Sequence, residues 1–194
     1  MAEMSQRAQS WCRSAPWQAF ARRVVLPWAL QGQELHGDVL EIGCGSGAMA
    51  AGMLQRHPTI RLTATDYDDA MVDAARIRLA KFSDRADVRQ ADATALPFAD
   101  GAFDNVVTFI MLHHVIAWEA ALAEIARVLR PGGELIGYDL VGDGVGRVMN
   151  GHEHGTRRMH FDELRAELDR LAYVEPRLKK GVGGLTVRFR AARR

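Results

Sequence analysis

A short apolar segment followed by three alternate glycines constrains the fold of this chain more than any other feature. Residues 39–47 read Val-Leu-Glu-Ile-Gly-Cys-Gly-Ser-Gly, and a run of helix-favouring residues follows at 48–51. This order predicts a buried strand, a tight turn and the first turn of a helix. Glycine permits a positive φ and a close ligand approach, and the helix start provides unpaired N–H groups. We therefore expect a small polar ligand to lie across this turn.

Composition describes an ordinary globular chain. Its 194 residues, 48% of them hydrophobic and 25% charged, with a net charge of +1, give no general attraction to nucleic acid or membranes. The two cysteines, Cys12 and Cys44, lie too far apart for a disulfide framework or a zinc motif, which indicates a reducing compartment. No apolar run approaches the roughly 20 residues of a membrane span. We expect a cytoplasmic monomer or homodimer without a metal.

Strand and helix patterns alternate from Asp38 onward. We expect strands at 39–42, 60–65, 88–91, 103–110 and 134–141, and helices at 48–56, 69–81 and 117–129. This alternation with short loops predicts a Rossmann-like, doubly wound α/β fold around a mostly parallel sheet. A helix at 161–172 and an antiparallel β-hairpin of 173–180 with 185–191 complete the chain.

Two segments depart from this rhythm. Residues 1–36 are expected to form an N-terminal helical arm of two short pieces, punctuated by Pro16 and Pro27, ahead of the main domain at 37–194. The arm either covers the edge of the sheet or closes over a ligand, with Trp17 and Phe20 facing inward. Residues 142–160 form a long glycine-rich connection, a length that is often functional. We expect this connection to form a substrate lid, whose Arg157 faces an acidic group of the substrate.

The glycine turn alone leaves the ligand open, because its spacing also satisfies the loose dinucleotide-binding fingerprint. Asp66 ends the second predicted strand about 20 residues further on, where an acid can accept both hydroxyls of a ribose. Asp92 and Ala93 follow the third strand. Their carboxylate and backbone N–H can pair with the amino group and a ring nitrogen of adenine, which favours an adenosyl ligand.

Taken together, these motifs resemble those of class I S-adenosylmethionine-dependent methyltransferases, and most closely the ubiquinone/menaquinone-biosynthesis type. The resemblance covers roughly residues 38–141 and rests on Glu41-x-Gly43-x-Gly45-x-Gly47, Asp66, Asp92-Ala93, Leu96-Pro97-Phe98, Phe103-Asp104, Leu112-His113-His114 and Leu129-Arg130-Pro131-Gly132-Gly133. It implies a seven-stranded sheet whose last strand runs antiparallel. It also implies S-adenosylmethionine as the cofactor and methyl transfer as the reaction. The matched motifs carry nothing specific to the acceptor, which we expect to be a small molecule.

The resemblance further implies a set of cofactor-binding positions. The turn of Gly43, Gly45 and Gly47, with Glu41 before it, would pass under the methionine part of the cofactor. Asp66 would hold the ribose diol and Tyr67 would lie against the adenine. Asp92 would accept from the adenine amino group, the Ala93 N–H would reach a ring nitrogen, and the carbonyl of Phe109 would meet the methionine ammonium.

Other features leave alternatives open. His113, His114 and His152 are candidate general bases and none is preferred, while Asp139 is either structural or substrate-facing. Cys44 is expected to be a small packing residue, and the spacing of His152 and His154 suits a solvated loop. Arginines and lysines after Glu175 leave open an RNA or protein methyltransferase, although a charged edge hairpin explains them equally well. A non-catalytic cofactor-binding protein and a nicotinamide-dependent oxidoreductase are the remaining readings.

Overall fold

The computed structural model describes residues 15–142, 159–171 and 173–194. In these residues seven strands form one sheet in the order β3-β2-β1-β4-β5-β7-β6. The strands are β1 (Asp38–Ile42), β2 (Arg61–Asp66), β3 (Ala86–Gln90), β4 (Phe103–Phe109), β5 (Leu129–Leu140), β6 (Tyr173–Lys180) and β7 (Thr186–Arg193). Neighbours from β3 to β5 pair in parallel, and β7 runs antiparallel to both β5 and β6. The predicted seven-stranded, mostly parallel sheet is confirmed.

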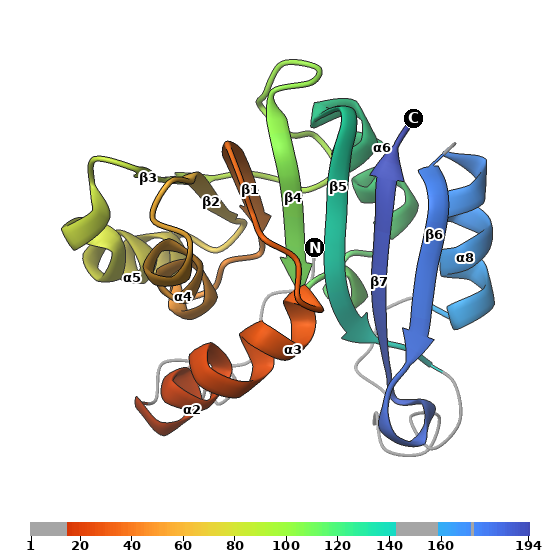
Figure 1. The fold of residues 1–194 in the computed structure, drawn as a ribbon, viewed down its shortest axis with the longest axis horizontal. Helices are drawn as coiled ribbons and strands as arrows, with labels where there is room; N and C mark the ends of the chain where they lie inside the picture. Colours follow the sequence, from red (N-terminus) through yellow and green to blue (C-terminus); the bar gives the residue numbers. More distant parts are fainter. Residues whose placement is uncertain (1–14, 143–158, 172) are drawn as a thin grey trace.

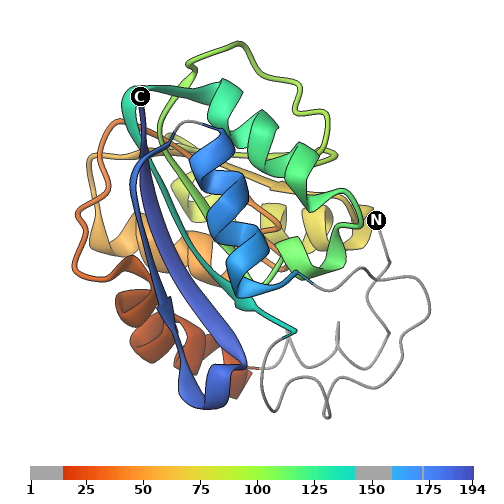
Figure 2. The same ribbon diagram turned by 90° about the vertical axis from the view of Figure 1, so that its right-hand side faces the viewer.

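Helices cover both faces of the sheet (Figures 1 and 2). One layer contains α3 (Leu26–Leu30), α4 (Ala48–Arg56) and α5 (Asp69–Leu79), and the other contains α6 (Trp118–Val128) and α8 (Phe161–Arg170). Successive side chains of β1 point to opposite faces of the sheet. Val39 packs in the cluster of α3 and α4, whereas Leu40 packs in the cluster of α6 and α8. The doubly wound arrangement follows from this alternation of buried side chains.

The described part of the N-terminal arm is one continuous helical run rather than the two pieces expected. α2 (Ala15–Phe20) leads into a π-helical segment at Ala21–Val25 and then into α3. The Leu26 N–H bonds to the carbonyl of Ala21, five residues earlier. This wider turn makes room for the ring of Pro27, which would otherwise break a regular helix. The run ends at Gln31, whose φ is +55°.

Element boundaries differ from the sequence expectations most at β5. The expected strand begins at Glu134, but Leu129 already pairs with Phe103 before the turn of Arg130–Gly133 interrupts the register. Gly132 takes a φ of +79° in this turn, and a Cβ on Gly133 would lie 2.8 Å from the carbonyl oxygen of Asp104. A bulge with close backbone packing therefore replaces the expected loop. Elsewhere the strands and helices agree with expectation to within a few residues.

The carboxyl ends of β1, β2, β4 and β5 meet at one edge, which is the lower edge in Figure 1 and the side crossed by α2 and α3. The chain order reverses between β1 and β4, and ligands of open α/β sheets bind outside the strands at such a point. The described helices include none long and apolar enough to cross a membrane.

Candidate cofactor-binding site

The glycine turn after β1 has the backbone that the sequence predicts. Gly43, Gly45 and Gly47 have φ values of +74°, +52° and +76°. The N–H groups of Gly43 and Cys44 bond to the carbonyl of Thr65 at 2.8 and 2.9 Å, so the turn is fixed to the end of β2. L-residues with side chains rarely adopt such φ values. Glycine is therefore required here by conformation alone.

The three glycines differ in what surrounds them. A Cβ on Gly43 would lie 2.2 Å from Cγ of Met111, and one on Gly47 would lie 3.2 Å from Cβ of Ala75. A Cβ on Gly45 would meet no atom within 4 Å. Gly43 and Gly47 thus permit packing inside the protein, while Gly45 presents bare backbone to open space, as the binding of a ligand across the turn requires.

Asp66 at the end of β2 is tied to the same turn. Its Oδ2 accepts a hydrogen bond of 2.8 Å from the Gly45 N–H, and its Oδ1 accepts one of 3.0 Å from the Asp68 N–H. Burial raises the pKa of this carboxyl, while the Asp68 and Gly45 N–H groups oppose the increase. Each carboxylate oxygen can accept a second hydrogen bond. Asp66 can therefore hold the turn and bind a diol at the same time.

Glu41, at the carboxyl end of β1, is a buried acid that lacks a partner. Its side chain is 1% exposed, and among the described residues its Oε2 has no hydrogen-bond partner. Burial, with a smaller contribution from the charge of Asp66, raises the pKa of Glu41 to about 8. An unpaired buried carboxyl is costly. A cationic group bound beside it would satisfy this side chain.

A cavity of about 770 Å³ opens beside Asp66, a size suited to a small ligand. It is lined by Tyr67, Asp68, Asp69, Ala70, Gln90, Ala91, Asp92, Ala95 and Pro97. The half-exposed ring of Tyr67 lies on its wall. Thr94 donates through its N–H and hydroxyl to Oδ1 of Asp92, at 2.8 and 2.7 Å, and these bonds lower the pKa of Asp92. Within the described ranges the buried Ala93 N–H has no acceptor, so both predicted adenine partners keep bonding capacity.

Two side chains that no sequence pattern singled out support this cavity from behind. Arg127 and Glu124 on α6 bind the backbone of Leu96 and Phe98 with three hydrogen bonds of 2.7–3.0 Å, and Arg127 pairs with both oxygens of Glu124 at 2.8 Å. The spacing of three along a predicted helix signals a pair, but nothing in the sequence indicates that the pair contacts a loop about 30 residues away.

A third group of residues gathers where β4 ends. Phe109 is buried, and Ile110 takes a φ of +52°, a costly conformation for a β-branched residue. The fully buried carboxylate of Asp139 accepts from the N–H groups of Met111 and Leu112, at 3.0 and 2.7 Å, and its other oxygen lies 2.6 Å from Nδ1 of His113. Asp139 therefore holds the strained turn and orients an imidazole, which is a structural role.

Several other candidates have a different place. Cys44 is buried and burial raises the pKa of its thiol, as expected for a packing residue. Phe20 is half-exposed, and the Trp17 side chain lies outside the described residues. So do the expected lid with Arg147, Arg157 and Arg158, and the pair of His152 and His154. Among the residues that the structure does describe, no group of three metal-binding side chains gathers.

The basic residues of the C-terminal hairpin are largely engaged within the protein. Arg190 pairs with Glu134, and Arg193 donates to the carbonyls of Arg127 and Leu129. Arg188 donates to the carbonyl of Trp28 at 3.0 Å and lies over its ring at 4.5 Å. These contacts account for three of the charges that suggested a phosphate-facing patch.

Comparison with known proteins gives the class of the chain. Residues 40–137, which contain the glycine turn, Asp66 and the cavity, match the methyltransferase domain family. The chain belongs to this family, so the domain is an S-adenosylmethionine-dependent methyltransferase domain.

Curated relatives share this domain. The chain is 36% identical over 118 residues to a ubiquinone/menaquinone biosynthesis C-methyltransferase of Desulfotalea psychrophila, covering 61% of this chain and 46% of that protein. It is 32% identical over 148 residues to a malonyl-[acyl-carrier protein] O-methyltransferase of Geobacter sulfurreducens, covering 70% and 55%. The chain thus spans about half the length of these relatives.

Solved structures share the fold over nearly the whole chain. A methyltransferase from Thermotoga maritima, described as a possible histamine N-methyltransferase, superposes with a TM-score of 0.76 at 22% identity and covers 97% of this chain and 95% of that chain. An S-adenosylmethionine-dependent methyltransferase from Aquifex aeolicus gives 0.74 at 16% identity and covers 98% and 99%.

Proposed function

We propose that this protein transfers the methyl group of S-adenosylmethionine to a small-molecule acceptor. The observation that carries the proposal is the junction of Asp66 and Gly45. One carboxylate oxygen of Asp66 fixes the turn through the Gly45 N–H, and no atom lies within 4 Å of the position of a Cβ on Gly45. The cavity of Tyr67 and Asp92 begins at the residue after Asp66. Such a junction provides contacts for the amino-acid, ribose and adenine parts of one extended ligand.

Each part of the cofactor has residues that fit it. Gly43, Gly45 and Gly47 would lie along the methionine, whose ammonium would meet the carbonyl of Phe109. The orphaned Oε2 of Glu41 is buried at the same strand end and supports a cationic neighbour.

The adenosine part would use the side chains around the cavity. Asp66 would accept from both ribose hydroxyls, and Tyr67 would lie against the adenine face. The free oxygen of Asp92 would accept from the adenine amino group while the Ala93 N–H donates to a ring nitrogen.

The chemistry asked of the protein is modest, because the bound sulfonium supplies an activated methyl group. Transfer is an in-line displacement by a nucleophile of the acceptor. Holding the acceptor close to the methyl carbon and excluding water can supply most of the acceleration. The chain therefore needs a binding surface above Gly45 more than it needs a set of reactive side chains.

A small-molecule acceptor also agrees with the name of the Desulfotalea psychrophila relative, a methyltransferase of ubiquinone and menaquinone biosynthesis. The Geobacter sulfurreducens relative is named for a malonyl group carried on an acyl-carrier protein. The engaged arginines of the C-terminal hairpin support a small-molecule acceptor over RNA. We also propose a division into a helical arm at 1–36 and a catalytic domain at 37–194. We further propose a cytoplasmic location, a monomeric or homodimeric state and a lid over residues 142–160.

Titration with S-adenosylhomocysteine, the product form of the cofactor, tests this proposal. Replacing Asp66 by alanine removes charge-assisted hydrogen bonds worth about 1.5–3 kcal/mol, so we expect roughly 10- to 150-fold weaker binding. Asp84→Ala changes an exposed carboxyl at the opposite edge of the sheet and serves as the matched control. Calorimetry on both variants, with thermal unfolding to verify the fold, measures the effect. Unchanged affinity in folded Asp66→Ala would contradict the site.

A further inference from the structure

His113 and Asp139 form a buried pair at the carboxyl edge of the sheet. His113 belongs to the 3-10 turn of Leu112–His114 after β4, and Asp139 lies near the end of β5. The Asp139 side chain is 0% exposed and that of His113 is 20% exposed. The pair thus consists of a carboxylate that is closed to water and an imidazole that is partly exposed to water.

The contacts of Asp139 determine which imidazole nitrogen carries the proton. Oδ2 accepts from the N–H groups of Met111 and Leu112, and Oδ1 accepts from the Leu140 N–H at 2.7 Å. These three N–H donors favour the ionised form of Asp139, which has no proton to donate, and this geometry points to Nδ1 of His113 as the donor in the 2.6 Å contact. Neutral His113 therefore keeps its lone pair on Nε2.

That lone pair is accessible. Within the described residues Nε2 has no hydrogen-bond partner. It is not among the buried polar atoms that lack a partner, so this nitrogen is open to solvent. Of the titratable side chains on the described elements, Asp139 and His114 contact the ring of His113. The His114 ring centroid lies 3.9 Å from that of His113. The exposed side of His113 is thus its basic side.

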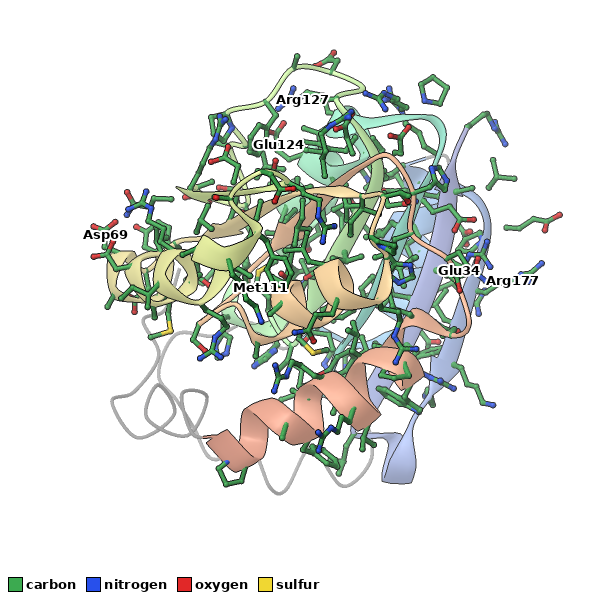
Figure 3. The ribbon with its side chains drawn as sticks, turned by 60° about the vertical axis from the view of Figure 1, so that its left-hand side comes forward. Glu34, Asp69, Met111, Glu124, Arg127 and Arg177 are labelled. Carbon is green, nitrogen blue, oxygen red and sulfur yellow. The ribbon has the colours of Figure 1, made fainter. Side chains whose placement is uncertain are left out.

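A short chain of contacts connects His113 to the glycine turn. Met111 packs directly on Gly43, as the clash with an added Cβ shows, and lies near the centre of Figure 3. The N–H of the same Met111 bonds to the carboxylate that orients His113. The Asp139 carboxylate therefore contacts both Met111, which packs on the turn, and the imidazole of His113. These contacts place His113 beside the expected methionine end of the cofactor.

We propose that His113 is the proton acceptor for a neutral hydroxyl of the methyl acceptor, and that Asp139 is its positioning residue. The inference rests on the proposed function and narrows its substrate class to compounds that are methylated on oxygen. The hydroxyl proton passes to Nε2 as the oxygen bonds to the methyl carbon, and the methyl–sulfur bond breaks with its electron pair left on sulfur. The imidazolium then gives its proton to water. Acceptors that react as anions already, such as carboxylates, do not need this pair.

Imidazole NMR of the full chain tests the inference without any acceptor. In long-range ¹H–¹⁵N spectra at mildly alkaline pH, with S-adenosylhomocysteine present, we expect His113 to be neutral and protonated on Nδ1; His113→Gln assigns its signals. Asp139→Asn places an amide donor toward Nδ1, so the proton should move to Nε2. Because this variant loses an acceptor for backbone N–H groups and can unfold, the wild-type tautomer alone is decisive: a proton on Nε2 overturns the proposal.

Methyl transfer supplies the second measurement. The wild type is incubated with methyl-labelled S-adenosylmethionine and a small-metabolite extract, and the labelled product is characterised. We expect an O-methyl product whose formation falls about 10²- to 10⁴-fold in His113→Gln while the affinity for S-adenosylhomocysteine is kept. His36→Gln, at an exposed position before β1, is the matched control, with a change of a few-fold at most.

The outcomes separate the inference from the function it rests on. Label on nitrogen, carbon or sulfur, or equal rates in His113→Gln, overturns the role of His113 and leaves the methyltransferase proposal standing. Failure of the wild type to bind S-adenosylhomocysteine, or to label any acceptor, overturns both.

Discussion

Arg127 and Glu124 lie one turn apart on α6 and together fix the backbone of the loop behind the cavity of Tyr67 and Asp92. The guanidinium donates to both oxygens of Glu124 at 2.8 Å and to the carbonyls of Leu96 and Phe98 at 3.0 and 2.7 Å. Glu124 in turn accepts from the Leu96 N–H at 2.8 Å. The two side chains are adjacent in Figure 3. A helix of the layer opposite α4 and α5 thus shapes a wall of the cavity.

Breaking this pair should weaken cofactor binding without removing a ligand contact. Arg127→Met frees two loop carbonyls and leaves Glu124 without its partner, so the wall beside Asp92 and Pro97 loses its fixed position. We expect roughly 5- to 20-fold weaker binding of S-adenosylhomocysteine, or about 1–2 kcal/mol. Hydrogen exchange should also rise across residues 92–100.

Arg177→Met is the matched control for that change, because Arg177 is exposed, meets Glu175 only at 3.9 Å and lies far from Arg127 in Figure 3. Equal loss of affinity in both variants would show that overall stability, not the loop, is responsible. Arg127→Lys should recover only part of the affinity, since an ammonium cannot reach Glu124 and both carbonyls in the same plane.

The glycines of the turn should separate folding from binding. Gly43→Ala forces Cβ to within 2.2 Å of Met111, so we expect a loss of several kcal/mol in the free energy of unfolding. Gly45→Ala meets no neighbour and bears only the cost of a positive φ, about 1–2 kcal/mol. Its methyl group instead occupies the open surface, so affinity for S-adenosylhomocysteine should fall at least tenfold. Chemical denaturation and calorimetry of both variants distinguish these effects; normal binding by Gly45→Ala would place the ligand elsewhere.

The buried acid Glu41 should make stability depend on pH in a definite direction. Its pKa is about 8 in the folded chain against an ordinary 4.5, so between these values the folded state binds a proton that the unfolded state has released. The free energy of unfolding must then fall as pH rises through this range. Glu41→Gln removes this dependence, which raises the Tm at about pH 8 by roughly 2–4 °C per kcal/mol gained.

Melting curves of wild type and Glu41→Gln between pH 5 and 8 measure the effect. Asp87→Asn, at an exposed position of β3, is the control and should keep the wild-type slope. Parallel slopes for wild type and Glu41→Gln would mean that Glu41 is ionised in the folded protein. Addition of S-adenosylhomocysteine should reduce the wild-type slope if its ammonium pairs with Glu41.

The sequence predicts those parts of the molecule whose conformation is determined by residues close together in the chain. Gly43, Gly45 and Gly47 sit in one turn, and the strand before and the helix after them set their geometry. Asp66 was predictable because a strand end at that distance from the turn must lie beside it in a parallel sheet. Both predictions concern the path of the backbone and not contacts between side chains.

Contacts between distant segments escaped the sequence because no short pattern encodes them. Asp139 meets the 111–113 turn through a sheet pairing of β4 with β5, and Arg127 reaches a loop about 30 residues before it. The prediction of a break at Pro27 was wrong for a related reason. A proline predicts a helix break from its own chemistry, but packing of the run on α4, where Leu26 covers Gly52, favours a π turn that keeps the helix intact.

The docking of the N-terminal arm rests on Trp28, and this dependence is testable. The Trp28 ring meets the Tyr138 ring edge-on at 5.3 Å, and Tyr138 lies 5.7 Å from the ring of Phe109 at the site. The Arg188 guanidinium lies over the indole, 4.5 Å from the ring centroid. Trp28→Ala removes both contacts of the indole ring, with Tyr138 and with Arg188, so we expect trypsin to cleave after the exposed Arg23 at least several times faster.

Ile77→Ala is the control for that change, because Ile77 is 81% exposed on α5 and its cleavage rate should match the wild type. S-adenosylhomocysteine adds a further distinction. If the arm closes over the ligand, saturation should slow cleavage of the wild type but not of Trp28→Ala, whose arm no longer docks beside Phe109. If the arm only covers the sheet, the ligand should leave both rates unchanged. The ratio of the two rates with and without ligand therefore decides between the two roles.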